Sequence, residues 1–243
     1  MRRRGFTLVE LLVVMAIITI LAGMLMPAIE AARSQAYATS CRSRLSQLGH
    51  AVSLYCINHH GYLPGVGDYT GRYFFGRYSG PTEPVDFAAG YLSSYVDTER
   101  EIWQCPGFTE FLPRAEGATC GYAYNYQYLT EYGDNGLGWF DPNYKWWYRG
   151  LSEGVIKKYT TTAVFGDSAT NWMGPLQENW YWTPPSQGLP WGNSYTHFRH
   201  RLRANVLWAD GHVSSMEPDK RVPLDRDGLG VICDESDFYY KPQ

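Results

Sequence analysis

Basic residues are few in this chain of 243 residues: 21 lysines and arginines stand against 24 aspartates and glutamates, for a formal net charge of −3. Proteins that bind nucleic acid usually carry a basic excess gathered on one face. No basic stripe and no known nucleic-acid motif occurs in the sequence. We therefore expect no nucleic acid among the partners.

Motifs of metal and nucleotide chemistry are also missing. The five cysteines form no Cys-x-x-Cys pair, and no cysteine–histidine spacing is typical of a zinc site. There is no glycine-rich loop of the kind that cradles phosphates. We therefore expect a protein without a resident cofactor and without enzymatic activity.

The sequence does contain one long apolar run, residues 6–26, interrupted by a single charge at Glu10. Its length is about what a helix needs to cross the hydrocarbon core of a bilayer. Residues 1–5 in front of it read Met-Arg-Arg-Arg-Gly, and such a basic leader stays on the cytoplasmic side. We therefore expect residues 6–26 to span a membrane once, with the remainder of the chain across it.

The junction before the apolar run carries a distinctive pattern. Gly5, Phe6 and Glu10, followed by a membrane-length helix, resemble position by position the class III signal of type IV prepilins and type II secretion pseudopilins. An ordinary secretory signal is cleaved after its apolar core, whereas this signal is cleaved before it. The resemblance implies that a prepilin peptidase cuts between Gly5 and Phe6 and methylates the new amine of Phe6.

The resemblance also implies a role for Glu10 in assembly. A carboxylate within an apolar helix is costly in lipid and usually has a partner. In pilin-like filaments the proposed partner is the N-terminal amine of a neighbouring subunit, which here is the amine of Phe6. Other pilin subunits and the bacterial inner membrane are then partners, and the rest of the chain lies in the periplasm or outside the cell. The alternative is a plain membrane anchor with a hydrated Glu10.

The helix is expected to continue as an amphipathic segment over residues 27–60 and to pack on a domain. The side chains at helical spacing are Ala28, Ala31, Ala32, Ala38, Leu45, Leu48, Val52 and Tyr55. The helix should end near Gly61 and Pro64. Pro27 is expected to kink it or open it locally, since proline removes a backbone donor. A break between two separate helices is the alternative.

Residues 61–243 change to short segments separated by glycine and proline, which predicts an α+β domain with a small antiparallel sheet and long loops. Together with the helix this gives a type IV pilin-like architecture. Strands are expected at 121–128 and 160–165, and a loop at 131–150. The clearest hairpin joins 204–209 to 212–216 through a two-residue Asp210-Gly211 turn.

A second resemblance concerns the C-terminal half. His200, nine further residues and Asp210-Gly211 resemble the His-X9-Asp-Gly signature of a domain found on large pilin-like proteins with the same leader, which places the motif hairpin near 197–216. Other pieces similar to that family are 41–48 with Tyr55, 61–64, 105–106, 121–125 and 166–168. His200 and Asp210 also suggest a general base with an orienting carboxylate. Because Asp210 already serves the turn, we expect His200 to pin the hairpin structurally rather than to catalyse.

Disulfides are permitted in the expected compartment. Cys105 and Cys120 bracket a short loop rich in proline and glycine, so a bridge between them is a hypothesis. Cys41 and Cys56 lie about 22 Å apart if both belong to one helix, too far for a bridge.

The C-terminal tail offers a weak calcium candidate. Asp225, Asp227 and Asp234 supply carboxylate oxygens, which suit that ion. Their spacing matches no EF-hand, and an acidic, solvated tail is the favoured interpretation.

Aromatic residues are unusually many, with 20 tyrosines, 9 tryptophans and 10 phenylalanines. They serve either as the core of a domain poor in aliphatics or as an exposed surface that binds carbohydrate. The tryptophans considered for such a surface are Trp139, Trp146, Trp147, Trp172, Trp180 and Trp182. We favour core and subunit contacts. The sequence thus predicts a structural subunit of a secretion pseudopilus or type IV pilus, and the alternative is a membrane-anchored surface-binding protein that does not polymerise.

Overall fold

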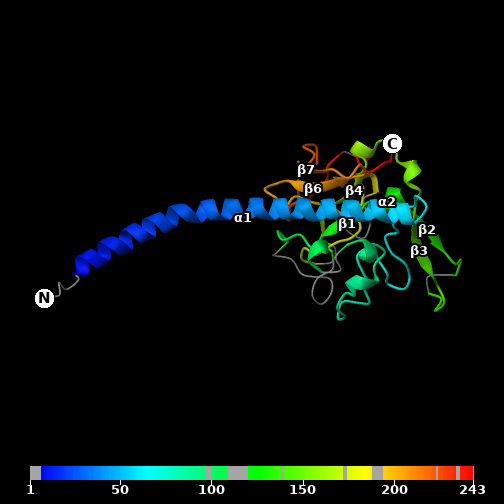
Figure 1. The fold of residues 1–243 in the computed structure, drawn as a ribbon, viewed down its shortest axis with the longest axis horizontal. Helices are drawn as coiled ribbons and strands as arrows, with labels where there is room; N and C mark the ends of the chain where they lie inside the picture. The colour runs from blue at the N-terminus through cyan, green and yellow to red at the C-terminus, as the bar shows by residue number, and fades with distance from the viewer. Residues whose placement is uncertain are drawn as a thin grey trace.

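A single long helix dominates the computed structural model, which describes residues 7–96, 100–108, 120–137, 140–171, 174–187, 194–222, 224–233 and 236–242. This helix, α1 (Leu8–Asn58), has 51 residues, and its first half projects away from the rest of the chain (Figure 1). The second half lies against an antiparallel β domain with long loops. The α+β prediction is therefore confirmed.

The helix runs without interruption through Pro27. The alternative of two separate helices is therefore wrong. Proline removes one backbone donor and crowds the preceding turn, and Figure 1 shows that the projecting part of α1 is bent. The expected end is confirmed, because α1 stops at Asn58, and Gly61, with a φ of +79°, donates its N–H to the Cys56 carbonyl.

Packing starts later along α1 than its periodicity indicated. Ala28, Ala31 and Ala32 are predicted to face the domain, but all three are exposed. The buried residues of α1 are Cys41, Leu45, Leu48, Gly49, Ala51, Val52 and Cys56. Alanine suits every face of a helix, so its spacing does not reveal which face is covered.

The main sheet has six antiparallel strands in the order β7-β6-β4-β5-β8, with β1 paired to β4. The strands are β1 (Tyr122–Tyr124), β4 (Ala163–Thr170), β5 (Ser194–His197), β6 (Ala204–Trp208), β7 (Val213–Met216) and β8 (Leu229–Gly230). All eight residues of β4 are buried, and this strand pairs with β1, β5 and β6. A strand was expected at 160–165, and β4 instead continues through 166–168 to Thr170.

Two expectations for the middle of the chain need correction. The predicted strand 121–128 is β1 followed by a short helix, α2 (Tyr126–Leu129). The predicted loop 131–150 contains a hairpin, in which β2 (Thr130–Asp134) pairs with β3 (Trp146–Gly150). The residues between these two strands are polar and rich in glycine, so the composition of the segment predicted a loop. The 3-10 turns are η1 (Phe87–Ala89), η2 (Ser93–Tyr95), η3 (Arg100–Trp103), η4 (Glu153–Val155), η5 (Tyr159–Thr161) and η6 (Pro185–Gln187).

The main sheet is buried on both faces, as β6 illustrates. Leu207 belongs to the core beneath α1, whereas its neighbours Val206 and Trp208 belong to a second cluster, as expected for alternating side chains. At Gly49 the helix comes so close to β6 that an added Cβ would lie 2.9 Å from Leu207 Cδ1. The second cluster also holds Trp182 and Tyr240, both fully buried. Aromatic side chains therefore do supply core on both faces.

The C-terminal tail is joined to β5 through His197. Its Nε2 lies 3.0 Å from the Asp227 carbonyl oxygen, and Phe198 donates its N–H to the Gly228 carbonyl. Burial lowers the pKa of His197, and Arg199 lowers it further, to about 3. A proton on His197 is therefore unfavourable in the folded protein.

We predict that His197 makes the fold less stable as the pH falls. Below a pH of about 6.5 the unfolded chain binds a proton at this histidine that the folded chain does not bind, so stability drops with each step toward about pH 4, by at most about 1.4 kcal/mol per pH unit. The measurement is thermal unfolding of the full-length protein in detergent across this range. His197→Gln should flatten the dependence; a slope equal to that of the wild-type protein would contradict the assignment.

Candidate functional site

The start of α1 is closed by a reciprocal pair of side chains. Glu10 Oε2 accepts hydrogen bonds from the Thr7 N–H and from the Thr7 hydroxyl, each at 2.8 Å, and the Glu10 N–H donates to Thr7 Oγ1 at 3.3 Å. This capping box satisfies donors that an α-helix leaves open at its start. Gly5 and Phe6 lie outside the described residues, so the cleavage expected between them stays a prediction. The carboxylate of Glu10 sits beside the residue that follows Phe6.

The first half of α1 has an uncovered apolar surface. Residues 7–33 are all exposed, including leucines, isoleucines and methionines such as Leu21 at 56%, Met24 at 70% and Ile29 at 56%. Among the described residues, α1 is the one helix long and apolar enough to cross a membrane. An apolar surface of this extent on one element needs lipid or another protein to cover it.

Where α1 enters the domain, four polar side chains meet in the core. They are Cys41 of α1, Cys105 after η3, Asp167 of β4 and His200 between β5 and β6, all of them buried. His200 Nε2 lies 3.3 Å from Cys105 Sγ and 3.3 Å from Asp167 Oδ2, and Cys41 Sγ lies 3.2 Å from Asp167 Oδ1. We call these four residues the buried cluster.

The buried cluster is surrounded by further polar groups. The Asn205 N–H donates to Asp167 Oδ2 at 2.7 Å, and the Tyr122 hydroxyl lies 3.1 Å from Cys41 Sγ. Arg199 Nε lies 3.7 Å from Asp167 Oδ1, with its side chain almost fully buried. The Nη2 group of Arg199 donates to the carbonyls of Gly121 and Ser168. A permanent positive charge is therefore held next to the cluster.

These contacts shift the pKa values of the cluster. Burial lowers the pKa of His200, but the hydrogen bonds with Asp167 and Cys105 outweigh it and raise that pKa to about 9. Burial raises the pKa of Asp167, but Arg199 and His200 hold it below its ordinary value. Burial also raises the pKa of the Cys41 thiol well above normal, whereas in Cys105 the hydrogen bonds with Cys41 and His200 outweigh burial and lower the pKa to about 6.

The predicted Cys105–Cys120 disulfide is not formed. Both residues are buried free thiols, and their sulfur atoms have different partners. Cys120 Sγ donates to the Tyr122 carbonyl at 3.1 Å, whereas Cys105 Sγ faces His200. The loop between them lies mostly outside the described residues. The short separation of the two cysteines in the sequence did not show which partner each thiol contacts.

The sequence predicted that a ring nitrogen of His200 pins the hairpin, but its Nε2 lies against Cys105 and Asp167. Asp210 Oδ1 instead accepts the His212 N–H at 3.1 Å and lies 2.5 Å from His212 Nδ1. The hairpin itself is present, but its loop has three residues rather than two. The Trp208 N–H donates to the His212 carbonyl, and the Gly211 N–H, at a φ of +88°, donates to the Trp208 carbonyl. A turn followed by glycine in the left-handed region is the usual three-residue solution.

The calcium candidates are already engaged in local hydrogen bonds. Asp225 Oδ1 accepts the N–H groups of Asp227 and Leu229, and Asn171 Nδ2 donates to Asp225 Oδ2 and Asp227 Oδ2. Asp234 lies outside the described residues. These contacts make a closed turn at the start of β8, a role that the tail composition did not reveal.

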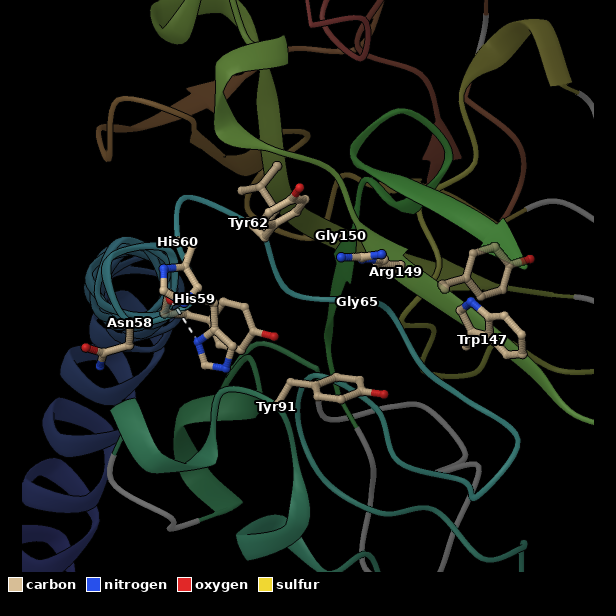
Figure 2. A pocket seen from close by; sticks show the side chains of 12 residues that line it. Asn58, His59, His60, Tyr62, Gly65, Tyr91, Trp147, Arg149 and Gly150 are labelled. Carbon is tan, nitrogen blue, oxygen red and sulfur yellow. Dashed lines mark hydrogen bonds between the residues drawn. The ribbon is translucent and has the colours of Figure 1, made fainter. Parts of the chain in front are cut away.

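A pocket of about 550 Å³ opens at the C-terminal end of α1. Figure 2 shows Asn58 and His59 on the helix side and Trp147 and Arg149 on the β3 side. His59 stacks on Tyr55 with ring centroids 3.8 Å apart, and Arg149 lies over the Tyr62 ring at 5.2 Å. The walls are thus aromatic with a cationic edge.

The tryptophans do not form one exposed surface. Trp180 and Trp182 are buried in the two cores, and Trp146 is half-buried. Trp147, which is 39% exposed, lines the pocket. Trp139 and Trp172 lie outside the described residues. At least two of the six are therefore core residues, as the favoured interpretation requires.

Residues 150–154 read Gly-Leu-Ser-Glu-Gly, which fits the Gly-x-Ser-x-Gly pattern of serine hydrolases. In those enzymes the serine occupies a sharp turn from a strand into an α-helix. Here Ser152 precedes the single 3-10 turn η4, and its Oγ accepts the Gly154 N–H at 3.3 Å. Its visible role is to cap that turn.

Comparison with known proteins bears on the N-terminus. Residues 1–26 match the family described as the prokaryotic N-terminal methylation motif. The match supports a type IV pilin- or pseudopilin-like protein that a prepilin peptidase processes, and with the apolar helix it indicates a single-pass membrane anchor. No curated protein and no solved structure matches the chain.

We predict that the two halves of α1 differ in their effect on folding. Leu48→Ala empties a fully buried position beneath β6 and should lower the free energy of unfolding by about 2–5 kcal/mol. Leu25→Ala, at a position 58% exposed, should leave it almost unchanged. Denaturant unfolding of both full-length variants in detergent measures the difference, and equal losses would contradict the division.

Proposed function

We propose that the protein is a type IV pilin-like filament subunit of a secretion pseudopilus or pilus. The observation that carries this proposal is the uncovered apolar half of α1, which is joined without interruption to a folded domain and belongs, up to residue 26, to the methylation motif. A core helix would be covered by its own domain. A helix continuous with the domain is suited to bundling with copies of itself.

The expected sequence of events follows from the helix. The precursor inserts with its arginine leader on the cytoplasmic side, and the domain lies in the periplasm or outside. Cleavage after Gly5 frees the amine of Phe6, and the apolar helices of neighbouring subunits then pack together as they leave the lipid. The domain faces outward, with the pocket near Trp147 at the end of α1 far from the projecting half.

The capping box supports a role for Glu10 in that packing. In a single chain the carboxylate is bound by Thr7, which follows Phe6 directly. A cationic amine from a neighbouring subunit is a stronger partner than two neutral donors, and a low dielectric increases the difference. Exchange of the Thr7 contacts for that amine would set the register between adjacent helices.

We also propose that residues 61–243 form a His-X9-Asp-Gly domain. Support comes from the way in which the sequence pieces similar to that family meet in space. Residues from 41–48, 105–106, 166–168 and the His200 segment contribute one side chain each to the buried cluster, and Arg199 bonds the Gly121 and Ser168 carbonyls. Segments that lie far apart in the sequence thus meet at the buried cluster.

We predict that the mature protein begins at Phe6 and is heavier by one methyl group than the unmodified cleaved chain. Intact mass and N-terminal sequencing of protein recovered from native membranes measure this. Gly5→Leu should keep residues 1–5 on the chain, because it replaces the motif residue next to the proposed cut. A start at Met1, or a cut after Ala22 or Gly23, would contradict the pilin pathway and favour a plain anchor or an ordinary signal.

We predict that Glu10→Ala and Glu10→Val insert into the membrane normally but assemble poorly. The readout is crosslinking between single cysteines placed in the apolar half of α1 on neighbouring copies, with each variant compared at equal abundance. Glu30→Ala is the matched control, since Glu30 is also an exposed acid of α1 but lies beyond the apolar run. Normal crosslinking in both Glu10 variants would sink the pairing mechanism, and its absence in the wild type would favour a non-polymerising surface protein.

A further inference from the structure

The buried cluster brings together four potential metal ligands from four distant segments of the chain. The sulfur atoms of Cys41 and Cys105, a carboxylate oxygen of Asp167 and a ring nitrogen of His200 all lie within 4.8 Å of one another. All four residues are buried. Two sulfurs, one nitrogen and one oxygen around a single point match the donor types and the number that a structural zinc ion takes.

The separations suit a tetrahedral site. Usual zinc–sulfur, zinc–nitrogen and zinc–oxygen bond lengths place neighbouring ligand atoms roughly 3.3 to 3.8 Å apart in a tetrahedron. Cys105 Sγ and Asp167 Oδ2 each lie 3.3 Å from His200 Nε2, and Cys41 Sγ lies 3.2 Å from the other carboxylate oxygen, Asp167 Oδ1. The four ligand atoms all lie within 4.8 Å of one another, so side-chain rotations that move them by about 1 Å would place them around one ion.

The contacts of the His200 ring distinguish the buried cluster from a catalytic triad. In a Cys-His-Asp triad the thiol and the carboxylate contact opposite nitrogens of the ring. Here Cys105 and Asp167 both approach the same nitrogen, Nε2. One nitrogen with either a single proton or a single lone pair cannot serve both partners well, but its lone pair can serve one metal ion at their centre.

The charges also balance when a divalent ion is present. Two thiolates and one carboxylate carry three negative charges, which a divalent ion and the Arg199 guanidinium together neutralise. Arg199 is suited to this role because its Nε lies 3.7 Å from Asp167, and its Nε and Nη1 donate no hydrogen bond among the described residues. Charges buried at this depth are tolerated only when they are compensated in this way.

Outer contacts hold the ligands in orientation. The Asn205 N–H fixes Asp167 Oδ2, and the Tyr122 hydroxyl lies within hydrogen-bond distance of the Cys41 sulfur. Such outer partners orient metal ligands and adjust their basicity.

We propose that Cys41, Cys105, Asp167 and His200 form a structural zinc site that fastens α1 to the main sheet. Cys41 is the first buried residue of α1, so the ion sits where the projecting helix leaves the domain. With four protein ligands and no access for substrate, the site is closed and serves stability. Metal binding is then coupled to folding, because only the folded chain assembles the four segments.

A disulfide between Cys41 and Cys105 is the main competing state of these residues. It would use the two sulfurs alone and would leave His200 and Asp167 to pair with each other. The zinc site accounts for all four side chains and for Arg199. The two states are distinguished by metal content and by the free thiols.

The test uses full-length protein purified in detergent without chelators and analysed by elemental mass spectrometry. We expect about one zinc ion per chain, which Cys41→Ser and His200→Ala should reduce to about one tenth or less. Cys56→Ser is the matched control, because Cys56 is a buried cysteine of the same helix that lies outside the cluster, and it should keep its zinc.

Two further measurements keep the test decisive if a ligand variant fails to fold. Replacement of zinc by Co²⁺ in the wild-type protein should give the visible absorption of tetrahedral, thiolate-bound cobalt. Removal of the metal by a chelator should lower the unfolding temperature, and added Zn²⁺ should restore it. Wild-type protein that carries no stoichiometric metal would overturn the proposal, whether Cys41 and Cys105 prove to be alkylatable thiols or linked in a disulfide in non-reduced peptides.

Discussion

The structure depends on one constraint: a single continuous helix has to be stable in two different surroundings, one along each half. From Cys41 onward α1 buries one face against β6 and β7, so residues of the same chain cover this face. Its large apolar side chains from Leu8 to Ile29 are exposed. Burial of each such side chain is worth about 1.5–3 kcal/mol, so this half of the helix is stable only in lipid or against other helices. The domain covers its own core, whereas the N-terminal half of α1 needs lipid or another protein to cover it, as the proposed assembly of subunits requires.

The N-terminal features were readable from the sequence because they are local. The leader, the apolar run and the helix end near Asn58 each depend on residues close together in the chain, and the Asp210-Gly211 turn is equally local. The face of α1 that packs was only partly predictable, since alanines at helical spacing mark no side as buried. The hairpin of β2 and β3 was missed because its strands hold charged residues and glycine, which composition assigns to a loop.

The buried cluster could not be found from spacing. Its members stand at positions 41, 105, 167 and 200, and none has a second cluster residue within a motif-length window. Only the packing of α1 on the sheet makes neighbours of them. The same packing separates the two ends of the His-X9-Asp-Gly pattern: His200 turns inward to Asp167, while Asp210 remains in the hairpin loop with His212. The two ends of this pattern thus make separate contacts, which their spacing in the sequence does not predict.

Residues 27–33 form a further part of α1 that lies beyond the apolar run and is fully exposed, whereas half-buried residues begin at Ser34. At the rise of an α-helix this segment is about 10 Å long, so in the proposed membrane-anchored subunit it would separate the domain from the bilayer by about that length. Because the segment is helical and not a flexible linker, any rotation of the membrane-embedded part about its axis turns the domain with it. In the proposed filament, the packing of the helices would therefore fix the orientation of each domain.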